Sequence, residues 1–429
     1  MSIAGIILVF TFLAATGAAV PVAVAVAIAG VVVIFLQGLP IILLAHRMVV
    51  AADSFTLIAI PGFMLIGSLM SRAGLVHRLV DLCMALVGWV RGGLSIAAMP
   101  ACMIFGGISG SGTADTAAVG SVMIPALIKS GYDPAHTAAL IAAGGAVGII
   151  VPPSIPMIIY GLSSNTSIPA LFIGGYVPGL LLTVCYSLYL YFIAKRRGYG
   201  VVQEFSAPAL GKAFKRAFWA LLAPIIIVGG IVSGIVTTTE SGIIGVAYVL
   251  FLGFVIHREL RVRDLFPAVL ETAVLTGVVM FLLTACSLFS LILARENVPD
   301  TLANAVLAMT SNRVVVLLLI NMMVIFLGCL MEPVAIIIIL TPVLLPISKL
   351  IGMDPVHFGV MFVFNLAIGL IHPPVGYCLF VSSSIARVPI EKVSWKIIPF
   401  FLIAIGALMV VTYSDIVGNV AHYVQKTPL

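Results

Sequence analysis

Apolar residues run through this chain in long blocks, separated by short polar or Gly- and Pro-containing stretches. About 20 apolar residues cross a hydrocarbon core that is ~30 Å thick, so each long block predicts a membrane-spanning helix. Such blocks lie at about residues 2–18, 20–45, 54–71, 136–163, 170–194, 218–236, 240–257, 266–294, 355–384 and 397–415. Two further apolar blocks, at about 93–129 and 314–350, each contain a break in the middle.

The two broken blocks belong to an internal repeat. Adding 221 to a residue number in the first half gives the matching residue in the second half, without a gap over about 50 residues. The matches include Asp133-Pro134-x-His136 with Asp354-Pro355-x-His357, and Pro152-Pro153 with Pro373-Pro374. Interrupted apolar segments in matching places of two halves indicate a transporter binding site. If each broken block is a re-entrant hairpin, five spans separate the two hairpins, so the repeat is inverted.

Composition and charge narrow the class of protein. Of the 429 residues, 62% are hydrophobic and only 8% are charged, whereas about 25% of the residues of a soluble protein are charged. A soluble enzyme, a nucleic-acid-binding protein and a disordered scaffold are therefore excluded. The six cysteines are scattered through apolar stretches and show no pairing or metal-binding pattern. The sequence predicts an all-α polytopic membrane protein.

The predicted topology is asymmetric in positive charge. It places 16 of the 21 Lys and Arg residues on one face, and by the positive-inside rule this face is cytoplasmic and both termini are periplasmic. The other face receives Arg47, Arg295, Arg313, Lys349 and Lys426.

We expect scaffold helices to surround a transport domain. The predicted scaffold comprises residues 1–72, 164–294 and 385–429, the last with the C-terminal tail, and the repeats comprise 93–163 and 314–384. Segments 73–92, 195–217 and 295–313 are predicted to lie at the membrane interface, although plain cytoplasmic loops explain 73–92 and 195–217 equally well.

The first hairpin break is rich in residues that disfavour a continuous helix. It reads Phe105-Gly-Gly-Ile-Ser-Gly-Ser-Gly-Thr-Ala-Asp115. Irregular backbone at membrane depth survives only where protein or a water-filled cavity satisfies it, and unwound carbonyls suit a monovalent cation. The alternative is close helix packing through small residues.

The first span break, Val151-Pro152-Pro153-Ser154, predicts two half-helices, because proline removes amide donors and frees carbonyls one turn earlier. The alternative is a packing kink. The second half repeats this plan with Glu332 in its hairpin and His372 in its span. Glu332 is a cation ligand, a proton carrier or a structural anchor, and His372 either joins the site or caps a half-helix.

Other polar groups have simpler explanations. Asp133 and Asp354, each followed by Pro, are typical helix N-caps, and Glu240 is expected to cap a nearby helix. The serines and Asn165 that follow the first broken span, and Ser382–Ser384 after the second, are either plain polar exits or donors for a bound carboxylate.

The stretches GGISGSGTADTAAVGSVMIP (106–125), GYDPAHTAALIAAGGAVGIIVPPS (131–154) and HPPVG (372–376) resemble the large membrane subunit of tripartite ATP-independent periplasmic transporters. The resemblance extends over the whole chain. It implies an inverted-repeat, elevator-type fold similar to divalent-anion/sodium symporters. It also implies sodium-coupled import of an organic acid across the bacterial inner membrane, with a separate four-helix membrane subunit and a periplasmic substrate-binding protein. C4-dicarboxylates and sugar acids such as sialic acid both fit.

The same resemblance assigns residues to the sites. Sodium (Na+), as a co-transported ion, would bind oxygens around Gly107, Ser109, Gly112 and Pro152 in the first site, and Gly328, Met331, His372 and Pro373 in the second. Most of these ligands would be backbone carbonyls. We expect the substrate near Ser111, Thr113, Asp115, Ser154, Asn165, Glu332, Gly376 and Ser382.

Three alternative functions compete with this interpretation. A proton-coupled transporter would use Glu332 and His372 as proton carriers. A rhomboid-like intramembrane protease would use Ser109 of Gly107-Ile-Ser109-Gly110 as nucleophile and His136 or His372 as base, but the repeat places Leu330 opposite Ser109. A passive channel is the third alternative. The chain has no Walker A motif, so we expect no direct use of ATP.

Overall fold

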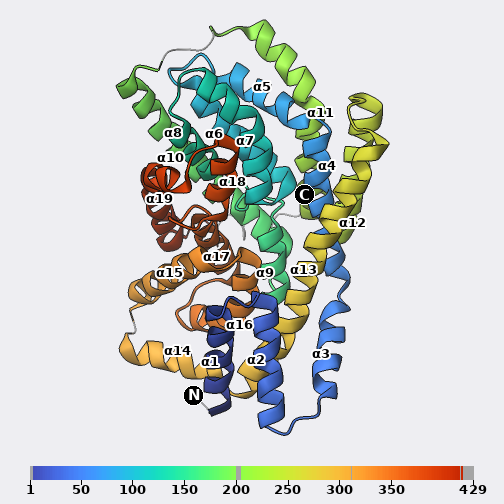
Figure 1. Cartoon of the computed structure of the whole chain (residues 1–429), viewed down its shortest axis with the longest axis vertical. Coiled ribbons are helices and arrows are strands. Elements are labelled where there is room, and N and C mark those ends of the chain that lie inside the picture. Colours follow the sequence, from blue (N-terminus) through green and yellow to red (C-terminus); the bar gives the residue numbers. More distant parts are fainter. Residues whose placement is uncertain (1–2, 200–203, 311, 416, 419–429) are drawn as a thin grey trace.

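A computed structural model describes residues 3–199, 204–310, 312–415 and 417–418, and within these ranges the chain is helical and contains no strand (Figure 1). Seven of its helices are long and apolar enough to cross a membrane, or eight if one bent pair is a single span. Lys426 and residues 200–203 of the predicted interfacial segment lie outside the described residues.

The helices fall into two groups. Those outside the predicted repeats are α1 Ile3–Gly17, α2 Val22–Leu36, α3 Ile42–Ala52, α4 Ala59–Arg72, α5 Leu75–Val87, α10 Ile168–Arg197, α11 Ala207–Val232, α12 Thr238–Phe251, α13 Val262–Arg295, α14 Val298–Met309 and α19 Ile390–Tyr413. Short η1 Phe55–Ile58 precedes α4, and a π-helical turn, η2 Leu252–Ile256, extends α12. Those inside the repeats are α6 Gly93–Ser109, α7 Gly112–Lys129, α8 Pro134–Val147, α9 Ile155–Ser164, α15 Arg313–Leu330, α16 Pro333–Leu350, α17 Pro355–Gly369 and α18 Tyr377–Ala386.

The offset of 221 that relates the sequences also relates the helix ends. Helices α6 and α7 form hairpin 1, with a two-residue break at Gly110-Ser111, and α15 and α16 form hairpin 2, with its break at Met331-Glu332. Each hairpin is followed by a span in two pieces, α8 and α9 or α17 and α18, interrupted at the paired prolines. The two halves therefore share one order of helices and breaks.

Local chemistry fixes the helix ends of the repeats. Gly110 ends α6 in the left-handed conformation at φ 64°, where a side chain is disfavoured. Asp133 Oδ1 accepts the amide of Ala135 at 3.2 Å, and Asp354 Oδ1 accepts the amide of Val356 at 2.8 Å. The prediction that both aspartates are N-caps is confirmed. The capping box of Glu240 with Thr237 is also as predicted.

The two repeats interlock instead of packing side by side. Helix α9 of the first repeat packs against α16 of hairpin 2, and α18 of the second repeat packs against α7 of hairpin 1. Glycines permit the closest approach within each half: a Cβ on Gly148 would lie 3.1 Å from Cα of Gly106, and a Cβ on Gly328 would lie 3.1 Å from Cα of Gly369. Long helix α13 runs beside this assembly (Figure 1).

Two predicted elements differ from the structure. The block at 20–45 is not one span, because α2 ends at Leu36 and Gly38, at φ 62°, and Pro40 precede the separate helix α3. The block at 218–236 begins earlier, because α11 starts at Ala207 and absorbs the basic residues that were predicted to form an interfacial segment. Hydropathy alone missed this start, since Lys and Arg are good helix formers.

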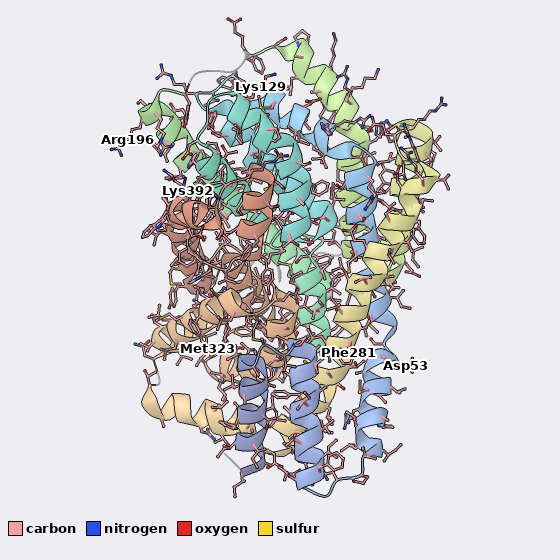
Figure 2. All side chains as sticks on the ribbon, viewed as in Figure 1. Asp53, Lys129, Arg196, Phe281, Met323 and Lys392 are labelled. Carbon is pink, nitrogen blue, oxygen red and sulfur yellow. The ribbon has the colours of Figure 1, made fainter. Side chains whose placement is uncertain are left out.

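The three labelled basic residues lie toward one end of the long axis (Figure 2). Lys129, Arg196 and Lys392 lie in the upper half of Figure 2, whereas Asp53, Phe281 and Met323 lie in the lower half. The predicted interfacial segments contain short helices, α5 within 73–92 and α14 within 295–313.

Candidate functional site

The tip of hairpin 1 packs directly onto the first span break. The amide of Ile155 donates to the carbonyl of Gly110 at 3.4 Å. A Cβ on Gly107 would lie 3.1 Å from the carbonyl oxygen of Pro152, and one on Gly110 would lie 2.8 Å from that of Pro153. Backbone oxygens of the hairpin and the broken span are therefore close together, and Gly107 and Pro152 of the predicted first sodium site are brought into one place.

A serine and an aspartate form the polar centre of hairpin 1. The Ser109 hydroxyl donates to Oδ1 of Asp115, and the amide of Ser111 donates to the Ser109 oxygen at 3.1 Å. Ser109 and Asp115 are 1% and 0% exposed, and Oδ2 of Asp115 has no hydrogen-bond partner among the described residues. This arrangement holds an acidic group behind the tip, where it fixes the Ser109 oxygen.

The two hairpin tips line one cavity of about 450 Å³, which we call the inter-tip cavity. It contains five predicted site residues: Ser111, Gly112, Thr113, Met331 and Glu332. Glu332 is exposed in this space although its helix is packed in the interior. Pro21 at the start of α2 and Leu275 of α13 close other sides. Hydroxyl groups from one repeat and a carboxyl group from the other thus line the same cavity, and the Ser111 and Thr113 hydroxyls lie 3.3 Å apart.

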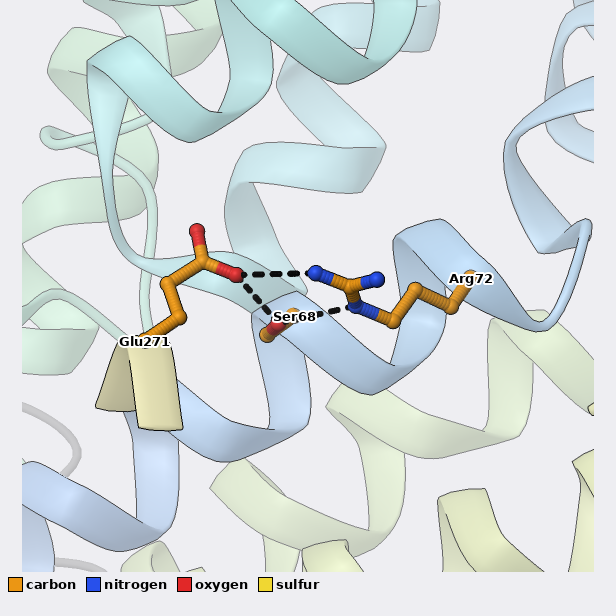
Figure 3. A network of polar contacts seen from close by, with 3 residues as sticks. All are labelled: Ser68, Arg72 and Glu271. Atoms are coloured by element: carbon orange, nitrogen blue, oxygen red, sulfur yellow. Dashed lines mark hydrogen bonds and ion pairs between the residues drawn. The ribbon is translucent and has the colours of Figure 1, made fainter. Parts of the chain in front are cut away.

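A second cavity, the side cavity of about 430 Å³, adjoins the first, because Met64, Ser111, Ile155 and Leu275 line both. Its wall carries a network that the sequence analysis did not identify (Figure 3). Glu271 Oε2 accepts from the Ser68 hydroxyl at 2.8 Å and from Nη2 of Arg72 at 3.3 Å. Arg72 is the only cationic residue among the described lining of the two cavities. No sequence signal joins α4 to Glu271, 199 residues away.

The second predicted sodium site is less completely assembled. Gly328 meets Gly369 where α15 and α17 cross, and Met331 caps α15 beside the inter-tip cavity. The ring of His372 stands edge-on to Phe401 at 5.0 Å, and its Nδ1 has no partner among the described residues. Gly376 donates to the carbonyl of His372 at 2.9 Å, which closes a tight loop around Pro373.

Five of the eight predicted substrate residues lie outside the lining of the inter-tip cavity. Ser154 caps α9 and donates to the carbonyl of Ile149 at 2.5 Å. Ser382 is buried in α18 and bonds its own helix at Leu379. Asn165 lines a separate cavity of about 330 Å³ with Thr237. Gly376 and Asp115 are buried and do not line the inter-tip cavity either.

A buried polar chain was also missed. The side-chain amide of Asn365 donates to Asn321 at 2.8 Å, and Asn321 donates to Thr412 at 3.1 Å, joining α17, α15 and α19. The offset of 221 matches Asn321 with Pro100 and Asn365 with Gly144, so the first half cannot form this chain. The repeat therefore gave no signal for it.

The donors at the tips suit a hard monovalent cation better than a transition metal. They are backbone carbonyls, hydroxyls and single carboxylates, the type of oxygen ligand that unwound helix ends provide for Na+. Within the described residues, no group of three or more His, Cys, Asp or Glu side chains could hold a metal ion.

Two hairpins and two broken spans line a shared internal cavity, and the described part of the chain is helical with seven apolar helices of spanning length; these features define a multi-pass membrane transport protein. The chain belongs to the family described as the DctM component of the tripartite ATP-independent periplasmic (TRAP) transporters, which it matches over residues 7–416. It is therefore a transport protein of the bacterial inner membrane and not an enzyme.

Relatives of known name cover most of the chain. The isethionate TRAP transporter permease protein DctMQ of Oleidesulfovibrio alaskensis is 41% identical over 92% of this chain, which spans 62% of that relative's length. The sialic acid large permease SiaM of Vibrio cholerae is 39% identical, over 83% of this chain and 84% of SiaM. The C4-dicarboxylate large permease DctM of Pseudomonas aeruginosa is 38% identical, over 86% of this chain and 87% of DctM.

A solved structure shares the fold. The crystal structure of the YdaH transporter of Alcanivorax borkumensis, described as having an unusual topology, aligns with a TM-score of 0.59 over 86% of each chain. The sequences are 17% identical, so this likeness concerns the fold alone.

Proposed function

We propose that this chain is the membrane subunit that carries an organic acid into the cell together with Na+. The observation that supports the proposal best is the inter-tip cavity, which is lined by Ser111 and Thr113 of one repeat and by Glu332 of the other. Hydroxyl and amide groups from half-helix ends can hold a carboxylate without burying a fixed cation. The named relatives take isethionate, sialic acid and C4-dicarboxylates, so the substrate class is an organic anion.

Sodium coupling rests on the oxygens around Gly107 and Pro152 and around Gly328 and Met331. We place one ion at each hairpin tip, where backbone carbonyls converge and positive charge offsets that of a bound acid. The Ser109 oxygen, fixed by Asp115, is the side-chain ligand of the first site. Because most ligands are carbonyls, single side-chain substitutions should weaken coupling without abolishing it.

Alternating access follows from the interlocked repeats. The hairpins and broken spans would move as one block past α4 and α13, which form the opposite wall of both cavities. A periplasmic binding protein would deliver the acid, and a small membrane subunit would complete the scaffold, as the word tripartite in the family description indicates.

Uptake into proteoliposomes tests this function. The chain is reconstituted with its small membrane subunit, and the binding protein is added outside with a radiolabelled panel of isethionate, sialic acid and C4-dicarboxylates. We expect accumulation of one acid only when Na+ is higher outside and the binding protein is present. Glu332→Gln should reduce uptake at least tenfold, while the exposed Glu391→Gln serves as the matched control.

Proton coupling is the second candidate, because Glu332 is a carboxyl group facing the inter-tip cavity. Accumulation driven by a pH gradient without Na+ would replace the sodium proposal by this one. A non-saturable flux that depends on neither the Na+ gradient nor the pH gradient would instead indicate a passive channel.

A further inference from the structure

A basic cavity of about 560 Å³ lies away from the hairpin tips, between the start of α5, the first half of α11 and the turn that follows η2. Its lining includes Arg78, Lys215, Arg216, Trp219 and His257. Two acidic residues, Asp81 and Glu259, also line it.

One cation of the basic cavity is already neutralised. Arg78 donates to Glu259 at 2.5 Å and to the carbonyl of Gly74 at 3.2 Å, and the Glu259 carboxylate lies where a side chain on Gly74 would stand. Glu259 is therefore held against the wall of the cavity by Arg78. This pairing leaves Asp81 as the only other acidic group in the lining.

The remaining donors are available to a ligand. Lys215 and Arg216 are exposed and take part in none of the ion pairs found in the described part of the chain. Nε2 of His257 is shielded from solvent and has no hydrogen-bond partner among the described residues. Two unpaired cations and one unsatisfied ring nitrogen around a cavity fit an anion with several acceptor oxygens, such as a phosphate.

The depth of the cavity points to the membrane surface as the source of that phosphate. Helix α11 has 26 residues and is about 39 Å long, whereas the hydrocarbon core is ~30 Å thick. The helix is therefore ~9 Å longer than the core, so its first turns reach the head-group layer, and the long side chains of Lys215 and Arg216 in the third turn extend to that level. Trp219 follows directly, 40% exposed, in the position of an interfacial aromatic anchor. Beyond it the helix shows an apolar face, with Ile225 63% exposed.

We propose that the basic cavity binds the head group of an anionic glycerophospholipid. The phosphate contacts Lys215 and Arg216, and the acyl chains lie along the exposed apolar face of α11. Basic pockets between membrane helices on the positively charged side bind such head groups. The proposal needs only that the protein resides in a membrane and is independent of the sodium and substrate assignments.

Native mass spectrometry of the purified full-length chain in detergent tests the proposal. Phosphatidylglycerol is titrated into the delipidated wild-type protein, the variant Lys215→Gln/Arg216→Gln, and the control Lys195→Gln/Arg196→Gln, which removes two exposed cations from the end of α10. A cation near an anionic lipid contributes roughly fivefold in affinity. We expect about thirtyfold weaker binding of the first bound lipid by the cavity variant and unchanged binding by the control.

Several results would overturn the assignment. Equal losses in the two variants would mean that only general surface charge attracts the lipid, and equal binding of phosphatidylcholine would remove the need for net negative charge. Displacement by millimolar inorganic phosphate would make the ligand a soluble phosphate. Displacement by the small membrane subunit would make the occupant a protein. If the double variant does not fold, Lys215→Gln alone must weaken binding about fivefold.

Discussion

The Ser109 hydroxyl donates a hydrogen bond to the Asp115 carboxylate, which is fully buried inside hairpin 1. The repeat places Ile336 opposite Asp115, so this pair belongs to the first half only. A buried acceptor that loses its donor has no water to replace it, and such a loss costs about 1–3 kcal/mol.

We therefore expect Ser109→Ala to destabilise the detergent-solubilised protein by about 1–3 kcal/mol, seen as a lower thermal unfolding midpoint. Ser121→Ala is the matched control, because the Ser121 hydroxyl is exposed and bonds only its own helix at Ala118. In the Asp115→Asn background the effect of Ser109→Ala should shrink. Additive effects of the two substitutions would contradict a direct energetic link.

Glycine matters at the residue scale where two backbones meet. A methyl group on Gly148 would press on Asp115 and on Gly106. Overpacking of a tight interior costs typically 1–3 kcal/mol, so Gly148→Ala should lower the unfolding midpoint. Gly277→Ala, on the exposed side of α13 with nothing within 4 Å, should not. Equal unfolding midpoints for Gly148→Ala and Gly277→Ala would show that α6 and α8 can move apart at little energetic cost.

At the scale of elements, capping was readable from sequence, whereas some helix limits were not. The Asp-Pro pairs correctly predicted the starts of α8 and α17, because an N-cap carboxylate accepts hydrogen bonds from the amides that a helix start leaves unpaired. The starts of α3 and α11 were missed, because apolar length does not register a Gly-Pro interruption or a helical basic segment.

Removal of one cap should have a small, specific cost. Asp354 accepts amides from Val356 and His357, so Asp354→Ala should destabilise the protein by about 0.5–2 kcal/mol. Asp354→Asn should be close to wild type, since asparagine caps as well. The thermal unfolding midpoints of the two variants distinguish these effects. If Asp354→Asn lowers the midpoint as much as Asp354→Ala, the negative charge of Asp354 stabilises the helix and capping does not.

At the scale of the whole molecule, the sequence located the hairpin tips but not the walls around them. Glycines and serines marked Gly110–Thr113, and the internal repeat extended the prediction to Met331–Glu332; both tips line the inter-tip cavity. The ion pair of Arg72 with Glu271 was not predicted, because it depends on how α4 packs against α13. The hydrophobic pattern of the sequence carries no information about that helix pairing. For the same reason Asn165 and Ser382 were assigned to a site that they do not line.

The proposed movement of the block can be trapped. A Cβ on Gly67 of α4 would lie 3.1 Å from Cβ of Ser109, close to the 3.5–4.5 Å that a disulfide spans. In a background lacking the six native cysteines, the pair Gly67→Cys/Ser109→Cys should lose uptake at least tenfold on oxidation and recover on reduction. Each single cysteine variant is the control. Undiminished uptake by the cross-linked protein would argue against a sliding block.

The interlocked packing also has a consequence for biosynthesis. Hairpin 1 packs against α18, and α9 packs against α16. Because α16 and α18 are translated later, the first half lacks part of its packing surface when it leaves the ribosome. The chain between Lys129 and Ala386 takes roughly 10–50 s to translate at about 5–20 residues per second. During that interval the glycine- and serine-rich tip, with the buried Asp115, lacks its final cover. The newly inserted first half must therefore wait in the membrane, and this wait is the period in which quality-control proteases and insertion factors have access to it.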